Sequence, residues 1–137
     1  MARMIAALRL SFFAAPKLSG LRKGFPRSLH GAPALLPSEG TALRRGIDAW
    51  LAARDIVPTI AGEFDDSALM KAFGARGFGV FAAPRVLEDE IRAQYGVQVV
   101  GRADDVREVF YAITVERRLR HPAVVAISKA ARQDLFG

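Results

Sequence analysis

The chain has 137 residues, enough for one modest domain, and half of them are hydrophobic while a quarter are charged, which is typical of a globular protein. It contains no cysteine, so a disulfide framework, a thiolate metal site and a cysteine nucleophile are excluded. The net charge of +6 belongs to one end, because residues 1–38 carry six basic residues and no acid, whereas the basic and acidic residues that follow cancel.

This basic first segment has two readings, a nucleic-acid arm or a solvated loop after an irregular start. No aromatic pattern typical of nucleic-acid binding is interleaved, which favours the loop. Residues 1–16 also resemble a targeting segment, but Arg9 interrupts the apolar run, which is too short to span a bilayer. Residues 1–40 contain no recognition helix preceded by a turn, so we expect no specific binding of operator DNA.

The first half of the chain alternates short apolar runs with one clear helix. These segments are predicted strands at 11–15 and 34–36, a loop over 16–33 and a helix over 41–54. Thr41 can cap the helix, whose apolar residues recur at helical spacing: Leu43, Ile47, Trp50 and Leu51. This spacing predicts that Trp50 lies in the core.

The second half continues the alternation. The predicted elements are strands 57–62, 80–83, 97–101 and 109–115 and helices 67–75, 85–94 and 122–134. Asp65 or Asp66 can cap the helix 67–75, in which Phe73 has the spacing of a core residue. Strands and helices of these lengths predict an α/β fold, an open and mostly parallel sheet flanked by helices.

Three blocks of sequence carry a resemblance to a known family. They are FFAAP at 12–16, GAPALLPSEGTALRRGIDAWLAARDIVPTIAGEFDDSALMKAFGARGFGVFAAP at 31–84 and VQVVGRADDVREVFYAITVERRLRHPAV at 97–124. In this order they resemble the second half of a LysR-type effector-binding domain. FDDSALMKAFG and ERRLRHPAV are most similar to the subgroup that activates expression of sodium/proton antiporters.

The resemblance implies one lobe of a two-lobed, periplasmic-binding-protein-like domain. Residues 11–107 would form the second lobe, 108–137 a return strand and helix that pack on a first lobe, and 1–10 lie outside the matched pattern. The chain therefore resembles an N-terminally truncated fragment of a cytoplasmic regulator. The intact protein would bind DNA through a helix-turn-helix, respond to a small molecule or ion and form homo-oligomers. The alternative is a fragment of a periplasmic-type solute-binding protein, which shares the two-lobed fold.

Catalytic chemistry is poorly supported by the sequence. His30 and His121 have no metal-ligand spacing and no neighbouring nucleophile. The consecutive acids Glu88, Asp89 and Glu90 do not share one helix face, so we read them as solvated. GARGFGVF lacks the Lys and Ser/Thr of a phosphate-binding loop. We expect no enzyme, no cofactor, no metal centre and no membrane contact.

Two turns from strand to helix form the candidate ligand site. Its residues are Ser38, Gly40, Thr41, Asp65, Asp66 and Ser67. Ligands of open parallel sheets bind outside the carboxyl ends of the strands, so both turns would line one crevice. Free N–H groups at helix starts suit an anion, while oxygens of Asp65, Asp66 and Glu63 suit a cation such as Na⁺. The alternative is that these residues are helix caps and nothing more.

Overall fold

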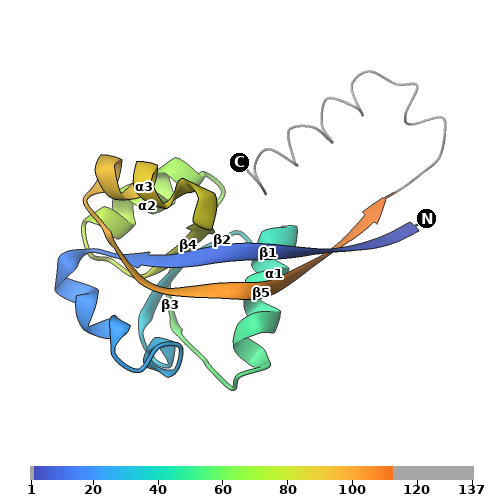
Figure 1. Cartoon of the computed structure of the whole chain (residues 1–137), viewed down its shortest axis with the longest axis horizontal. Helices are drawn as coiled ribbons and strands as arrows, with labels where there is room; N and C mark the ends of the chain where they lie inside the picture. Colours follow the sequence, from blue (N-terminus) through green and yellow to red (C-terminus); the bar gives the residue numbers. More distant parts are fainter. Residues whose placement is uncertain (1, 113–137) are drawn as a thin grey trace.

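A computed structural model of the chain describes the backbone of residues 2–112 and the side chains of residues 7–107. The predicted helix 122–134, the end of the strand 109–115, His121 and most of the return segment 108–137 lie outside the described residues. The described part is a mixed sheet with helices on both of its faces (Figure 1).

The sheet combines antiparallel and parallel pairs. Its strands are β1 (Ala2–Ala14), β2 (Pro33–Pro37), β3 (Thr59–Phe64), β4 (Phe81–Pro84) and β5 (Gln98–Ala112). β1 lies between β4 and β5 and is antiparallel to both, while β2 and β3 are parallel. Val80, just before β4, forms a parallel bridge to Ala34 of β2, which joins the two sets of strands.

The expectation of a mostly parallel sheet is therefore met only by β2, β3 and the Val80 bridge. Two short 3₁₀-helices, η1 (Pro16–Arg22) and η2 (Arg27–Leu29), connect β1 to β2. A parallel neighbour needs a long crossover, usually an α-helix. Such a helical crossover, through η3 (Arg85–Leu87) and α3 (Glu88–Tyr95), joins β4 to β5, and β1 lies between these two strands and runs antiparallel to both, whereas η1 and η2 lead to β2, which does not pair with β1. Residues 16–33 are thus more ordered than the predicted loop.

Each face of the sheet has its own apolar core, because side chains of a strand alternate between the two faces. On β1, Leu10 and Phe12 face α1 (Ala42–Ala52), whereas Phe13 faces α2 (Ser67–Ala75) and α3 (Glu88–Tyr95). A further 3₁₀-helix, η3 (Arg85–Leu87), precedes α3, where the sequence predicted one helix over 85–94.

The longest strand, β5, replaces two predicted strands. Separate strands were expected at 97–101 and 109–115, but one strand runs from Gln98 to Ala112. Leu8 of β1 pairs with Val106 and Leu10 with Ala103, so two residues of β1 oppose three of β5. This β-bulge lets both Ala103 and Val106 face the core, although residues three apart on a regular strand would face opposite sides of the sheet.

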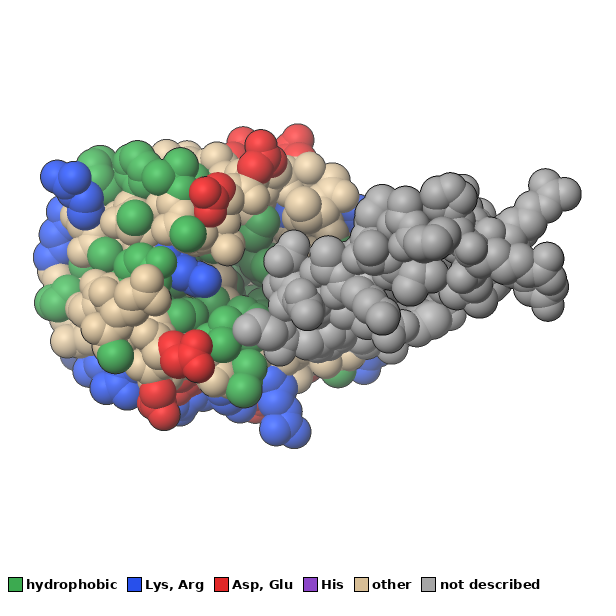
Figure 2. Space-filling view, turned by 90° about the horizontal axis from the view of Figure 1, so that it is seen from above, with side chains coloured by type: hydrophobic (Ala, Val, Ile, Leu, Met, Phe, Trp, Pro, Cys, Tyr) green, Lys and Arg blue, Asp and Glu red, His purple; other side chains and the backbone are tan. Residues whose placement is uncertain are grey.

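Of the four residues predicted to be buried on α1, Ile47, Trp50 and Leu51 are buried, and Leu43 is only partly buried against the same core. The corresponding prediction for Phe73 is wrong, since this side chain remains 38% exposed. It lies against Phe64 and Phe78 at the surface, with ring centroids 5.4 and 5.3 Å away, because the position facing the sheet from α2 is taken by Met70. Apolar side chains are also visible at the surface when the molecule is seen from above (Figure 2).

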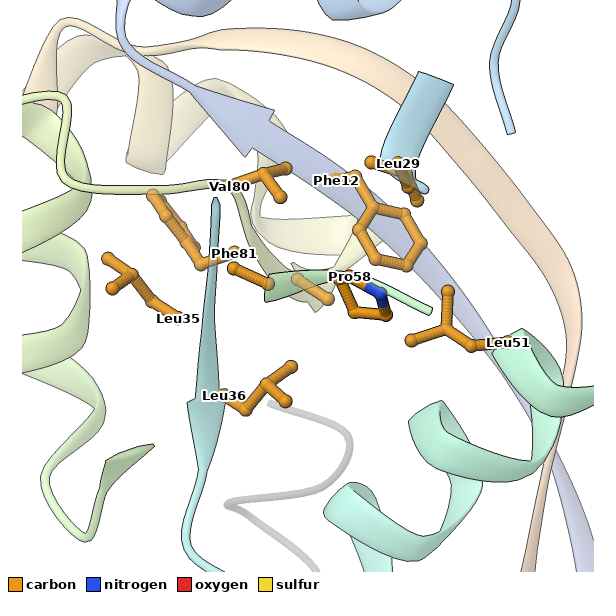
Figure 3. A pocket seen from close by; sticks show the side chains of 10 residues that line it. Phe12, Leu29, Leu35, Leu36, Leu51, Pro58, Val80 and Phe81 are labelled. Atoms are coloured by element: carbon orange, nitrogen blue, oxygen red, sulfur yellow. The ribbon is translucent and has the colours of Figure 1, made fainter. Parts of the chain in front are cut away.

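A small apolar hollow remains between the sheet and α1 (Figure 3). Phe12, Leu36, Leu51 and Pro58 are among its lining residues, and its volume is about 10 Å³. This is about the space of a single water-sized probe, and the apolar lining offers such a water little to bind. The hollow is therefore a feature of core packing and is too small for an effector.

Candidate functional site

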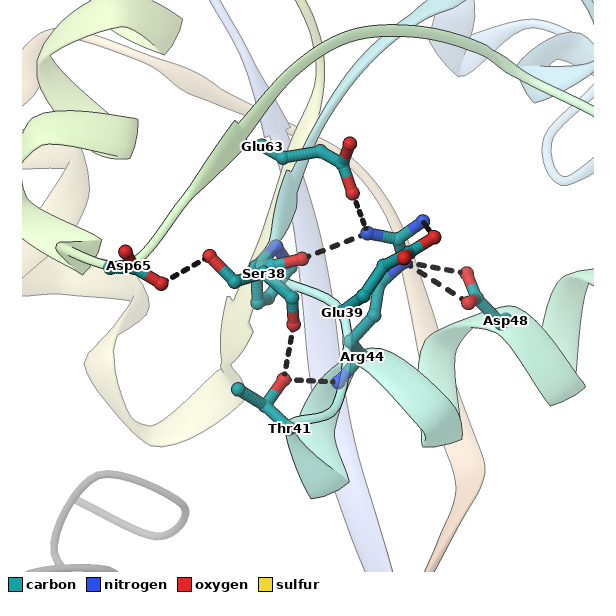
Figure 4. A network of polar contacts seen from close by, with 8 residues as sticks. Ser38, Glu39, Thr41, Arg44, Asp48, Glu63 and Asp65 are labelled. Atoms are coloured by element: carbon teal, nitrogen blue, oxygen red, sulfur yellow. Dashed lines mark hydrogen bonds and ion pairs between the residues drawn. The ribbon is translucent and has the colours of Figure 1, made fainter.

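The two predicted turns lie side by side at one edge of the sheet. β2 and β3 pair in parallel up to Pro37 and Phe64, so both strands end together. The backbone N–H of Ser38 donates to the carbonyl of Phe64 at 2.9 Å. The Ser38 hydroxyl donates to the Asp65 carboxylate, which links the turn after β2 directly to the turn after β3 (Figure 4).

Thr41 and Asp66 have the geometry of helix caps. The Thr41 hydroxyl accepts the Arg44 N–H at 3.1 Å and donates to the Ser38 carbonyl at 3.0 Å. The Asp66 carboxylate accepts the N–H groups of Ala68 and Leu69 at 2.8 and 3.3 Å. Both side chains are exposed and stabilise helix starts, so capping explains their presence without a ligand.

The other two predicted site residues border the same turns. Gly40 precedes the Thr41 cap with φ +87°, a left-handed conformation that favours glycine, and its carbonyl accepts a hydrogen bond from Arg45 at 2.8 Å. Ser67 is exposed as the first residue of α2. All six predicted residues therefore lie on the two turns, and Ser38 and Asp65 are the pair that joins them.

Arg44 is the principal residue of this region that the sequence reasoning missed. Its side chain is 5% exposed and donates to Glu63 at 2.6 Å, to Asp48 at 3.0 Å and to the Pro37 carbonyl at 3.0 Å (Figure 4). Burial opposes its charge, but hydrogen bonds to Glu63 and Asp48 outweigh that effect and keep the pKa of the guanidinium above its ordinary value. An arginine three residues before the core residue Ile47 was the available sign.

This arginine changes the role expected of Glu63. Its carboxylate pairs with Arg44, so it does not face the turns as a free cation ligand. Asp65 is exposed with Ser38 as its partner, and Glu39 is 81% exposed with Arg44 at 3.8 Å. Within residues 2–112, no group of three or more His, Cys, Asp or Glu side chains is arranged to hold a metal ion. The turns instead present separate, exposed carboxylates.

A second polar cluster joins β1, α3 and β5. Arg102 donates to both oxygens of Glu88 at 2.8 Å, and the buried Ser11 hydroxyl donates to the same carboxylate. The hydrogen bond from Arg102, followed by the one from Ser11, lowers the pKa of Glu88 to about 2 against the opposing effect of burial. The prediction that Glu88 is solvated is wrong, since its side chain is 13% exposed. Asp89 and Glu90 are exposed, as expected.

Solved structures with this fold are regulatory domains of transcription regulators. The regulatory domain of CcmR from Synechocystis PCC6803, in complex with 2-PG, matches 98% of this chain and 68% of its own with a TM-score of 0.60 at 11% identity. The regulatory domain of a HypT M206Q mutant from Salmonella typhimurium matches 96% of this chain and 66% of its own with a TM-score of 0.56 at 18% identity. At such identities the likeness defines the fold alone.

The sequence defines the family more closely. Residues 2–135 match the LysR substrate binding domain, and the chain belongs to this family. The match includes most of the segment 1–10 that the sequence reasoning left outside the resemblance. Transcriptional activator protein NhaR from Escherichia coli K12 and from Shigella flexneri are each 38% identical over 114 residues. The match covers 83% of this chain and 38% of the length of each relative.

Proposed function

We propose that this chain is the effector-sensing part of a LysR-type transcription regulator, related to regulation by sodium. The family assignment supports this reading over a periplasmic-type solute-binding protein. The 38% identity to a transcriptional activator supports it further. In this proposal the regulator acts in the cytoplasm, forms homo-oligomers and contacts operator DNA through a helix-turn-helix, and the domain catalyses no reaction. Among residues 2–112, no helix is long and apolar enough to cross a membrane.

The observation that carries the proposal is the link between the two turns. Ser38 and Asp65 come from loops 27 residues apart in the chain, yet one hydrogen bond connects them at the edge of the sheet. A ligand that binds Ser38 or Asp65 competes with this bond. Binding would therefore change how the starts of α1 and α2 are held relative to each other, which is the kind of differential contact that shifts a conformational equilibrium.

Local charge favours a cationic effector in this proposal. Glu39, Asp65 and Asp66 are exposed carboxylates beside the turns and outnumber the exposed Arg45, whereas the buried charge of Arg44 is already shared by Glu63 and Asp48. The excess of negative charge at the surface attracts a cation or an amine. Ser38, Thr41 and Asp65 would supply the hard oxygen atoms that such a cation prefers.

The experiment compares Na⁺ with K⁺ at equal ionic strength, so that charge screening is the same in both. We expect NaCl to raise the melting temperature of this chain more than KCl does, since a ligand that binds the native state stabilises it by mass action. Asp65→Asn should abolish the difference. Asp89→Asn, which removes the same charge from an exposed position on α3, should retain it.

A second arm tests regulation in the full-length regulator. A promoter reporter should respond to NaCl more strongly than to KCl, and Asp65→Asn should weaken that response. Asp66→Asn keeps the α2 cap, because Asn and Asp cap about equally well, and so separates the loss of charge from the loss of a cap. Equal melting temperatures in both salts, together with an unchanged reporter response in Asp65→Asn, would overturn the proposal and leave the turns as structural elements.

A further inference from the structure

The connection between β1 and β2 carries concentrated positive charge. We define the basic segment as residues 16–31, which include η1 and η2. Four basic side chains of this segment are exposed: Lys17, Arg22, Lys23 and Arg27. The first acidic residue of the chain is Glu39, so no carboxylate within the segment balances them.

These charges stand on a folded segment that packs against the body of the domain. Leu18, Leu21 and Phe25 pack against the core cluster next to β1 and α1. The Ser28 hydroxyl donates to the Leu21 carbonyl at 2.5 Å, which ties η2 to η1. Phe25 also covers Gly101 of β5 closely enough that any larger side chain there would meet its ring. The basic residues are therefore presented by an ordered surface.

The two arginines are held in place by neutral acceptors. Arg22 donates to the Val99 carbonyl at 3.0 Å. Arg27 donates to the carbonyls of Arg54 and Asp55 at 2.9 and 3.2 Å. Such hydrogen bonds orient a guanidinium without cancelling its charge. In the part of the chain that the structure describes, neither these arginines nor Lys17 and Lys23 form an ion pair.

We propose that the basic segment binds the phosphate backbone of duplex DNA without reading its sequence. The exposed residues of the segment are Lys, Arg, Gly, Pro and His, and its large apolar side chains are turned inward. Protein partners are usually gripped by exposed aromatic or aliphatic anchors, which this surface lacks. Phosphate contacts are made mainly by Lys and Arg and by backbone N–H groups, which this surface offers.

The shape of the segment explains why base reading is not expected. Its 3₁₀-helices span seven and three residues and pack on the domain, so neither is a free α-helix that could enter the major groove. Figure 1 draws η1 and η2 at the left end of the molecule, on the side of β1 away from α2 and α3. Contacts of this kind add affinity and orientation to a regulator whose sequence readout lies elsewhere.

The test measures binding of this chain to a fluorescent random-sequence duplex of about 20 base pairs between about 25 and about 150 mM salt. Binding should weaken linearly on logarithmic axes. Lys17→Gln/Lys23→Gln should reduce the slope by about 1.8, since each lost phosphate contact removes about 0.9. The control Arg92→Gln/Arg107→Gln removes the same charge from exposed positions on α3 and β5 and should leave the slope unchanged.

Unfolding curves of both variants should match the wild type, because all four side chains are exposed. The proposal is overturned if wild-type chain does not bind the duplex at the lowest salt, or if both double variants lose the same slope, which would reflect net charge alone. It is equally overturned if polyglutamate of matched charge displaces the duplex more effectively than unlabelled DNA does. That result would assign the surface to an acidic protein segment.

Discussion

Trp50 provides the sharpest test of the packing described above. It is the single tryptophan of the chain, is 6% exposed and lies in the core between α1 and β1. The rings of Phe12 and Phe25 lie 5.6 and 6.3 Å from it, and the Arg54 guanidinium stacks 4.0 Å from its ring centre. Its indole N–H donates to Asp105 at 2.8 Å. Trp50→Ala therefore removes both a large apolar volume and a polar link to β5.

The expected cost of Trp50→Ala is about 3–5 kcal/mol of unfolding free energy, because the truncation loses burial and leaves a cavity among aromatic rings. Trp50→Phe separates the two contributions. It keeps an aromatic ring in the core and loses the hydrogen bond to Asp105, which costs about 1 kcal/mol. This second cost is small because Asp105 is 63% exposed and retains its ion pair with Arg54.

Urea denaturation of the purified chain, followed by far-ultraviolet circular dichroism, measures both costs without relying on tryptophan fluorescence. Val86→Ala serves as the control, since Val86 is 74% exposed and its truncation should change stability by less than about 0.5 kcal/mol. A cost below about 1 kcal/mol for Trp50→Ala would refute the reasoning, because it would mean that the indole is not packed in the core.

Three further outcomes follow from the polar contacts and the backbone. The pKa of Glu88 is lowered from an ordinary 4.5 to about 2, so its ionised carboxylate stabilises the folded state above pH 4.5. This stabilisation is lost as the pH falls from 4.5 to about 2. Glu88→Gln should therefore flatten the fall of the melting temperature between pH 4.5 and about 2, and an equally steep fall would contradict this. Gly96→Ala should cost about 1 kcal/mol in urea denaturation, because Gly96 ends α3 with φ +67°; an unchanged midpoint would count against that strain. Glu63→Gln should cost about 1 kcal/mol, since it takes a charged partner from the buried Arg44, and calorimetry that finds no loss would show that Asp48 alone suffices.

Local features of the chain were predictable because local physics decides them. The spacing of Leu43, Ile47, Trp50 and Leu51 predicts the inward face of α1, on which Leu43 is only partly buried. Short oxygen side chains predict the two helix starts, with Thr41 at the first and either Asp65 or Asp66 at the second, where the structure has Asp66. The meeting of Ser38 and Asp65 was also predictable in outline, because parallel strands end at the same edge of a sheet.

Features that depend on distant partners were not predictable in the same way. The antiparallel position of β1 between β4 and β5 depends on pairing across almost the whole described chain, which no local pattern reports. Arg44 and Glu88 look like solvated charges in the sequence and become buried only because carboxylate or guanidinium partners arrive from other elements. The prediction for Phe73 fails for a related reason. Helical spacing identifies the apolar side of a helix, but it does not show which apolar side chains at the border of that side remain exposed.

The pairing of β1 gives the domain a change in mechanical stiffness along one strand. From Leu10 to Phe13 the strand is braced on both sides, by β4 and by β5, whereas from Ala2 to Leu8 it is paired with β5 alone. The β-bulge between Leu8 and Leu10 lies at the boundary between these two regimes. A two-stranded ribbon twists far more readily than a braced sheet, so torque applied at the outer end of β1 is absorbed by the ribbon while the body of the domain turns as one piece.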